Sequence, residues 1–96
     1  MSIFVVRPKI KRHIRSENGR KFDLFKPNGI PASELQSIKI DADEFEAIRL
    51  VDQERLSQQS AAQEMQISRQ TFANILKKSR FKISTALING HALVLP

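Results

Sequence analysis

Cysteine is absent from the 96-residue chain, and this absence removes several classes of site at once. Without thiols there is no disulfide, no thiolate metal cage and no cysteine nucleophile, and a reducing compartment suits the chain. Long apolar runs are also missing. The run from Ile3 to Val6 ends at Arg7, too short for a signal-peptide core or a membrane span. We therefore expect a cytoplasmic protein with no targeting segment and no membrane partner.

Tyrosine and tryptophan are absent, and only three glycines are present. Sequence-specific RNA recognition uses aromatic side chains on which bases stack, whereas the aromatic residues here are six phenylalanines, several of which the core needs. Gly19, Gly29 and Gly90 stand apart, so they form no phosphate-cradling loop. His13 and His91 lie in the predicted arm and tail, and no nucleophile or paired acid accompanies them at a defined spacing. We predict that the protein is not an enzyme and expect no cofactor.

Acidic residues are missing from the end of the chain, and this uneven charge is informative. Residues 1–30 contain eight basic residues (Lys or Arg) and two acidic ones. Residues 31–68 contain three basic and eight acidic residues, and residues 69–96 contain five basic residues and no acidic one. Two basic segments around an acidic middle are typical of a protein that binds a polyanion, most often nucleic acid. A solvated basic tail that serves solubility is the alternative.

The order of local patterns predicts one small domain with a marginal core. Residues 1–30 show no sustained period and predict an extended basic arm, whose Phe22, Leu24 and Phe25 dock on the body. Residues 31–96 form the domain, with a turn at 31–36, a strand at 37–40, helices at 43–54, 58–65 and 69–89, and a terminal strand at 91–96 paired with the first. The predicted fold is mainly α: a three-helix helix-turn-helix body with two short strands and a basic N-terminal arm.

The first helix is predicted to be central. Asp41 or Asp43 caps it, and the acidic residues of its first turn complement the helix dipole. Apolar residues take most of its circumference and leave a narrow polar strip of Glu46, Arg49 and Gln53. A divalent-metal site is the alternative explanation for Asp41, Asp43, Glu44 and Glu46, although no fixed loop or histidine accompanies them.

The segment "LSQQSAAQEMQISRQTFANILKK", residues 56–78, matches the requirements of a helix-turn-helix. Ser57 and Ser68 are predicted helix caps, and Gly90 ends the last helix. Ala61 and Ala62 are the small residues that allow the two helices to cross closely. Met65 and Ile67 are apolar residues that fill the corner between the helices, and Phe72 and Ile75 anchor the last helix beneath it. The last helix should bury Phe72, Ile75, Leu76, Ser79, Ile83, Ala86 and Leu87. Gln66 stands where such motifs often carry glycine, so it must accept a left-handed or equivalent conformation at modest cost. A plain helical hairpin is the alternative.

The outward side of the last helix carries groups that can contact DNA. An arginine pairs with guanine, and glutamine or asparagine with adenine, in the major groove, while hydroxyls near a helix N-terminus suit phosphate. The predicted DNA-binding residues of this segment are Ser57, Ser68, Arg69, Gln70, Thr71, Ala73, Asn74, Lys77 and Lys78. In the arm, the residues predicted to follow the DNA backbone or enter the minor groove are Arg7, Lys9, Lys11, Arg12 and Arg15.

Several segments together resemble the family of small predicted DNA-binding proteins known as DUF 134: "RPK" at 7–9, "FKPNGIP" at 25–31, "DADEFEAIRLVDQERLSQQSAAQEMQISRQTFANIL" at 41–76 and "ALINGHAL" at 86–93. The resemblance implies a helix-turn-helix similar to the fourth region of sigma factors, double-stranded DNA as partner and a transcriptional role. Family members often carry cysteines in the arm, whereas this sequence has none, so the resemblance does not extend to an arm-bound metal or to redox sensing. A sigma-like module that docks on RNA polymerase or an anti-sigma partner through its acidic middle is the alternative.

Phe81 and Ile88 do not fit the predicted core. At about 100° per residue they fall opposite the core side of the last helix, in line with Gln70, Asn74 and Lys77. Either the arm or terminal strand covers them, or a second copy does. We favour a homodimer, because a two-fold dimer contacts two DNA half-sites.

Overall fold

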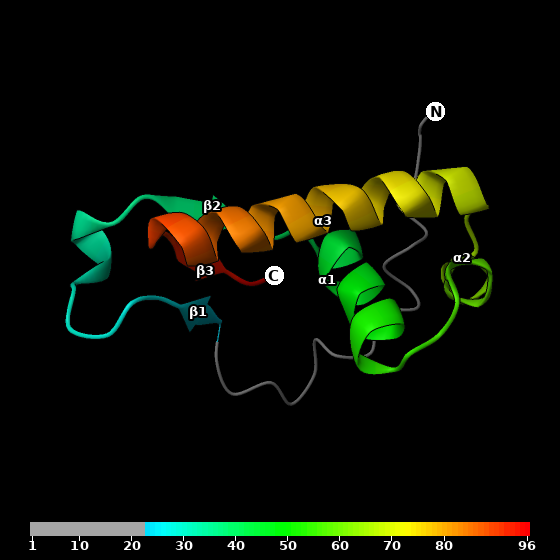
Figure 1. Ribbon diagram of the computed structural model, residues 1–96, viewed down its shortest axis with the longest axis horizontal. Helices are drawn as coiled ribbons and strands as arrows, with labels where there is room; N and C mark the ends of the chain where they lie inside the picture. The colour runs from blue at the N-terminus through cyan, green and yellow to red at the C-terminus, as the bar shows by residue number, and fades with distance from the viewer. Residues whose placement is uncertain (1–22) are drawn as a thin grey trace.

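The computed structural model describes residues 23–96, which form three helices and a small sheet (Figure 1). The helical elements are the 3-10 helix η2 (Ala32–Glu34), α1 (Ala42–Ile48), the π-helix η3 (Arg49–Gln53), α2 (Gln58–Met65) and α3 (Arg69–Asn89). The strands are β1 (Leu24–Phe25), β2 (Ser37–Lys39) and β3 (Ala92–Val94). The predicted mainly α fold is confirmed. In this part of the chain, no helix is both long and apolar enough to cross a membrane.

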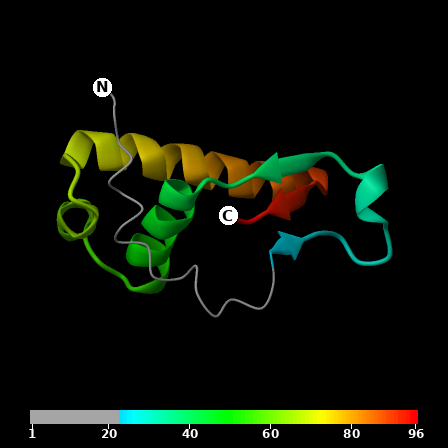
Figure 2. The ribbon, with the colours of Figure 1, turned by 180° about the vertical axis from the view of Figure 1, so that it is seen from behind.

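The sheet has three strands in the order β1-β3-β2, one more than predicted. The expected pairing of β2 with the terminal strand is confirmed and is parallel, with the helices forming the connection between the two strands (Figure 2). The additional strand β1 pairs antiparallel with β3, which confirms that Leu24 and Phe25 dock on the body. Phe22 lies outside the described residues. A two-residue strand is too short to show a period, so the sequence pattern could not predict it.

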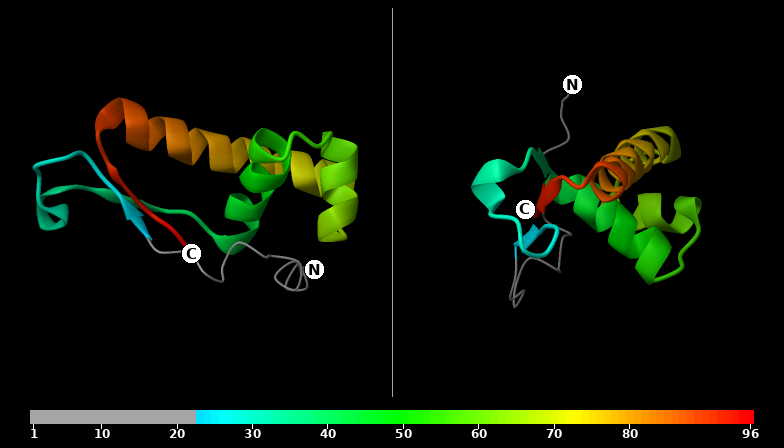
Figure 3. Two further views of the ribbon diagram at one scale, coloured as in Figure 1. Left: turned by 90° about the horizontal axis from the view of Figure 1, so that it is seen from below. Right: turned by 60° about the vertical axis from the view of Figure 1, so that its left-hand side comes forward.

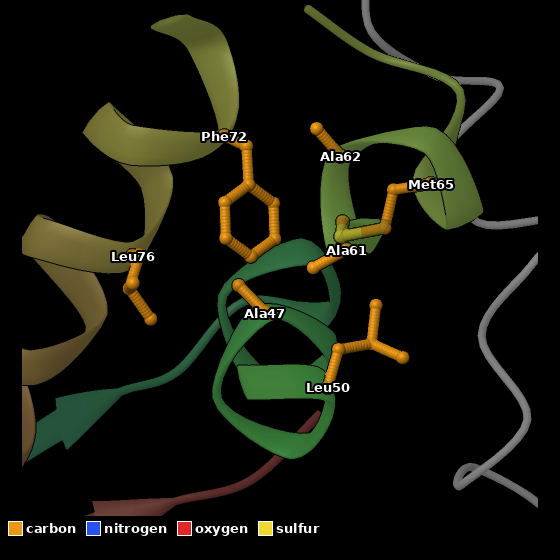
Figure 4. Close-up of a cluster of buried hydrophobic side chains, with 7 residues drawn as sticks. All are labelled: Ala47, Leu50, Ala61, Ala62, Met65, Phe72 and Leu76. Carbon is orange, nitrogen blue, oxygen red and sulfur yellow. The ribbon is translucent and has the colours of Figure 1, made fainter. Parts of the chain in front are cut away.

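Helix α3 runs along one side of the body and joins its two parts (Figure 3). Its N-terminal half packs on α1 and α2, and its C-terminal half contacts β2 and β3. The main core is formed by Ala47, Leu50, Ala61, Ala62, Met65, Phe72 and Leu76 (Figure 4). Three of these residues are alanines, which let the helices approach closely around the fully buried Phe72 ring.

The C-terminal half of α3 buries a narrower stripe than predicted. Ala86 is buried, as are Ile40, Ala92 and Leu95 from the sheet and its flanks. Leu87, predicted as core, is 76% exposed, so that prediction is wrong. The strands near this part of the helix are only two or three residues long, and Leu87 lies on the wall of an open hollow that Phe25 and Pro27 also line.

The predicted helix at 43–54 starts and ends slightly earlier and changes type within its length. Asp41 is the N-cap, and the Glu44 Oε1 atom accepts a hydrogen bond of 2.9 Å from the Asp41 N–H. After Ile48 the helix widens into η3, where the Glu54 N–H donates to the Arg49 carbonyl at 2.8 Å. Arg55 then takes a positive φ of 66° and ends the helical segment.

Two residues of the narrow polar strip predicted on this helix, Glu46 and Arg49, form an ion pair. Glu46 is only 1% exposed, and Arg49 donates to both of its oxygens, at 2.8 Å from Nε and 2.7 Å from Nη2. These hydrogen bonds to Glu46 raise the pKa of Arg49 above its ordinary value, although partial burial opposes the shift. A carboxylate can be buried here because the planar guanidinium supplies two donors at once.

The ends of α2 and α3 follow the predicted caps. The Ser57 and Ser68 hydroxyls each accept a backbone N–H at 3.0 Å, from Ser60 and Thr71. Gln66 adopts the left-handed conformation at φ 61°, and the Ile67 N–H donates to the Ala62 carbonyl at 3.1 Å. Gly90 ends α3 in the same conformation, at φ 72°. The short turn is therefore held by backbone hydrogen bonds of the Schellman type.

The Glu46–Arg49 pair generates a stability prediction. Arg49→Ala leaves the 1% exposed Glu46 side chain without its partner, and we expect the free energy of unfolding to fall by about 3 kcal/mol. The matched control is Arg80→Ala, because the side chains of Arg80 and its partner Asp52 are 50% and 44% exposed; this loss should stay below about 1 kcal/mol. Urea unfolding followed by circular dichroism measures both, and equal losses would contradict the assignment.

The conformation of Gln66 generates a second prediction. Gln66→Gly removes the Cβ that makes a left-handed residue costly, so the protein should gain about 0.5–1 kcal/mol of stability. Gln63→Gly, at an exposed position inside α2, is the control and should lose about 1 kcal/mol. Thermal unfolding distinguishes the two signs. A loss in Gln66→Gly would show that the Gln66 side chain contributes more than its backbone conformation costs.

Candidate nucleic-acid interface

Helices α2 and α3 form a helix-turn-helix arrangement. In Figure 1, α2 is seen nearly end-on while α3 runs across the view, so the two helices cross steeply. Met65 of α2 and Phe72 of α3 are both fully buried in the corner, and Ile67 in the turn packs against the same core. The N-terminal half of α3 is thereby held with its opposite face toward solvent.

The predicted base-contacting residues lie on this outer face of α3. Arg69, Gln70, Asn74 and Lys77 are exposed, whereas Ala73 is half-buried. The Gln70 Nε2 atom donates to the Asn74 Oδ1 atom at 3.3 Å, which holds the two amides side by side. Within residues 23–96, neither Arg69 nor Lys77 forms a salt bridge. The face therefore presents two amides and two positive charges that have no acidic partner among residues 23–96.

The hydroxyls predicted to meet phosphate are exposed and already hydrogen-bonded. Ser57 donates to the Ser60 Oγ atom at 3.1 Å, and Ser68 donates to the Thr71 Oγ1 atom at 2.9 Å. Both serines also accept the cap hydrogen bonds of α2 and α3. Their first role is to hold the helix N-termini.

One flank of the outer face is acidic, which no sequence pattern indicated. A hollow of about 140 Å³ beside α3 is lined by Asp41, Asp43, Glu44, Asn74, Ile75 and Lys78. The Lys78 Nζ atom lies 3.9 Å from the Glu44 carboxylate, and the Lys82 Nζ atom lies 2.7 Å from it. No local signal could have found this contact, because α1 and α3 are brought together only by the fold. Lys78 is therefore partly neutralised, unlike Lys77.

The opposite flank has one internal ion pair. Arg80 donates from Nη2 to the Asp52 Oδ1 atom at 2.7 Å and from Nε to Oδ2 at 3.2 Å. The hydrogen bonds to Asp52 raise the pKa of Arg80 above its ordinary value, against a smaller opposing effect of burial. Arg80 is thus a cation of α3 whose charge is already balanced.

The acidic residues considered as a metal site are used otherwise. Glu44 binds Lys82, and Glu46 binds Arg49. Within residues 23–96, no group of three or more His, Asp or Glu side chains comes together as metal ligands would. The predicted arm residues Arg7, Lys9, Lys11, Arg12 and Arg15, and His13, lie outside the described residues.

The names of the similar proteins do not state a function. The chain is 50% identical over 92 residues to a UPF0251 protein of Vibrio parahaemolyticus, with 96% of this chain and 94% of the relative covered. It is 59% identical over 73 residues to a UPF0251 protein of Shewanella sediminis, covering 76% of each. It is 51% identical over 89 residues to one of Aeromonas salmonicida, covering 93% of this chain and 85% of the relative. No solved structure matches significantly.

The family model described as "Protein of unknown function DUF134" matches residues 1–96, the whole of the chain. This match agrees with the resemblance carried by the segments at 7–9, 25–31, 41–76 and 86–93. Together with the relatives at about half identity, it places the helix-turn-helix arrangement and its small sheet in one family. The chain belongs to the DUF134 family.

Proposed function

We propose that the protein binds double-stranded DNA sequence-specifically through the N-terminal half of α3 and acts as a cytoplasmic transcription regulator without catalytic activity. The observation that carries the proposal is the exposed face of Arg69, Gln70, Asn74 and Lys77, set on a helix that crosses α2 and packs against the buried residues of α2, Ala61, Ala62 and Met65. A recognition helix of this kind enters the major groove with its N-terminal residues against the base edges.

The side chains on this face match the groups in the major groove. An arginine fork pairs with guanine O6 and N7, and a carboxamide pairs with adenine N6 and N7. The Gln70–Asn74 hydrogen bond restricts both amides before DNA arrives, which lowers the entropy lost on binding. Residues 69–96 hold no acidic side chain, so α3 adds no repulsion of its own toward phosphate.

The acidic hollow limits the direction of approach. At about 100° per residue, Arg69, Ala73 and Lys77 lie on the flank of α3 away from Lys78 and the carboxylates of α1. DNA that approaches from this flank meets the positive charges of Arg69 and Lys77 and avoids Asp41, whose side chain is 49% exposed. We therefore propose that Arg69 and Lys77 make the closest contacts, and that Lys78 contributes less.

A second candidate function is docking on the transcription machinery. The observation that favours it is exposed acidic charge outside α3: the side chains of Asp41 and Glu54 are 49% and 53% exposed, and Glu64 is exposed too. A basic surface of RNA polymerase would suit these groups. Salt dependence of binding to duplex DNA separates the two functions, because counterion release makes DNA affinity fall steeply with salt.

The DNA-binding proposal is tested by substitution of Arg69. After selection of a preferred site from random duplex DNA, Arg69→Ala should cost about 1–3 kcal/mol at that site and relax the preference at one base pair. The matched control is Arg80→Ala, which removes the same charge from α3 where Asp52 already balances it; its smaller loss should be equal on selected and random DNA. Fluorescence anisotropy measures both. Failure of the unmodified protein to bind any duplex would refute the proposal.

The role proposed for the arm is tested by deletion of residues 1–15, which removes Arg7, Lys9, Lys11, Arg12 and Arg15. For each arm residue that binds a phosphate, the deletion should flatten the slope of log affinity against log salt by about 0.9. Anisotropy titrations across a range of salt concentrations give the slope. An unchanged slope would show that the arm does not contact the DNA backbone.

A further inference from the structure

The outer face of α3 changes character along a single line of residues. Gln70, Asn74, Lys77, Phe81, Ser84 and Ile88 recur at intervals of three and four residues, so they share one side of the helix. All six are exposed. The N-terminal part of this line is polar and the C-terminal part is apolar, with Phe81 70% exposed and Ile88 81% exposed.

Phe81 and Ile88 form an exposed apolar line, and a binding partner would remove it from water. The residues around this line indicate the chemical character of that partner. Residues 83–89 of α3, "ISTALIN", carry no charge. Lys82, the one charged residue between Phe81 and Ile88, is turned toward the body, where its Nζ atom binds Glu44 and the Lys39 carbonyl. The same surface of a second copy can pack against this one without bringing like charges together. A strongly charged partner would find no opposite charges here with which to pair.

We infer that a second copy of the chain covers this line, with the C-terminal halves of two α3 helices packed antiparallel so that Phe81 of each copy lies against Ile88 of the other. The seven-residue spacing suits such helix pairing, because residues seven apart lie on the same side of a helix and pack into the gaps of its partner. The two-fold axis then passes between Ser84 and Thr85. Ser84 is small and exposed, and its hydroxyl bonds to the Arg80 carbonyl of its own helix at 2.8 Å, so it leaves no polar group unsatisfied there.

This arrangement sets the distance between two DNA-contacting faces, a consequence that rests on the proposed function. From the centre of residues 81–88 to the centre of residues 69–74 is about 20 Å along α3, so the two faces lie about 39 Å apart in straight antiparallel helices. At the crossing angle of about 20° that goes with this seven-residue pairing, the separation is about 38 Å. Half-sites one helical turn apart are separated by about 34–36 Å. The separation in the dimer is within a few ångströms of this spacing. The flank of α3 that carries Arg69 lies about 100° around the helix from the line, so the Arg69 flanks of the two copies can face one duplex.

The mass of the full chain in the absence of DNA tests the dimer separately from the proposed function. Sedimentation at micromolar concentration should give twice the chain mass of 11.0 kDa. Phe81→Asp and Ile88→Asp should each give a monomer that retains its helical circular dichroism. Leu87→Asp is the matched control: Leu87 is equally exposed but lies on the wall of a neighbouring cavity with Phe25 and Pro27, and this variant should remain a dimer.

The absence of native cysteine permits a test of the register. Ser84→Cys, close to the two-fold axis, should form a disulfide between copies under mild oxidation, because a bridge needs Cα atoms within about 7 Å. Gln70→Cys lies on the same line at the far end of α3 and should not form one. A Gln70→Cys bridge, or a dimer in which Ser84→Cys stays reduced, would overturn the antiparallel register.

Three results would overturn the dimer itself or its location. A wild-type chain that sediments as a monomer shows that the line is covered within one chain, with residues 1–22 as the candidate cover. A dimer that dissociates with Leu87→Asp but not with Ile88→Asp places the interface on the cavity side of α3. A dimer unaffected by Phe81→Asp places it elsewhere. DNA binding by a monomer would leave the proposed function standing, so the two failures are distinguishable.

Discussion

The relation between the sheet and the helix-turn-helix depends on one ammonium group. The Lys82 Nζ atom donates to the Lys39 carbonyl at 2.8 Å and to the Glu44 carboxylate at 2.7 Å, and so joins the end of β2, the start of α1 and the middle of α3. The buried Ser79 hydroxyl adds a hydrogen bond of 3.0 Å to the Glu44 carbonyl. Because Glu44 is only 2% exposed, its charge requires this partner, and the three elements cannot shift independently. The direction in which α3 presents its outer face follows from this contact.

Short sequence patterns, mainly the residues at the helix ends, were sufficient to predict the positions of α2, of the turn that follows it and of α3. Ser57, Ser68 and Gly90 are residues whose side chain or missing Cβ specifies a helix end, and Gln66 adopts the left-handed conformation that was one of those expected at this turn. The sequence could not predict β1 or the π-helix η3. The first is too short for a period, and the second depends on how a helix relaxes at its end rather than on a residue type.

The candidate site was predictable only along α3 itself. Helical periodicity correctly separated Phe72 from Arg69, Gln70 and Asn74, because the burial of one face determines the exposure of the other. What surrounds that face was not predictable. The acidic flank beside Asn74, the burial of Glu46 and the exposure of Leu87 all arise from the tertiary arrangement, which spacing along the chain does not encode.

The parallel pairing of β2 with β3 has a kinetic consequence. The two strands meet only after the chain between residues 40 and 91 has returned to its starting point, which is a long loop to close from a disordered state. Contacts among α1, α2 and α3 are closer in sequence, and helices form faster than distant strand pairs. We expect the helical body to assemble first and shorten the effective loop, so that the sheet closes last. Residues 92–95 include β3, which pairs with both other strands of the sheet. We therefore expect detachment of β3 from β1 and β2 to be the first step of unfolding.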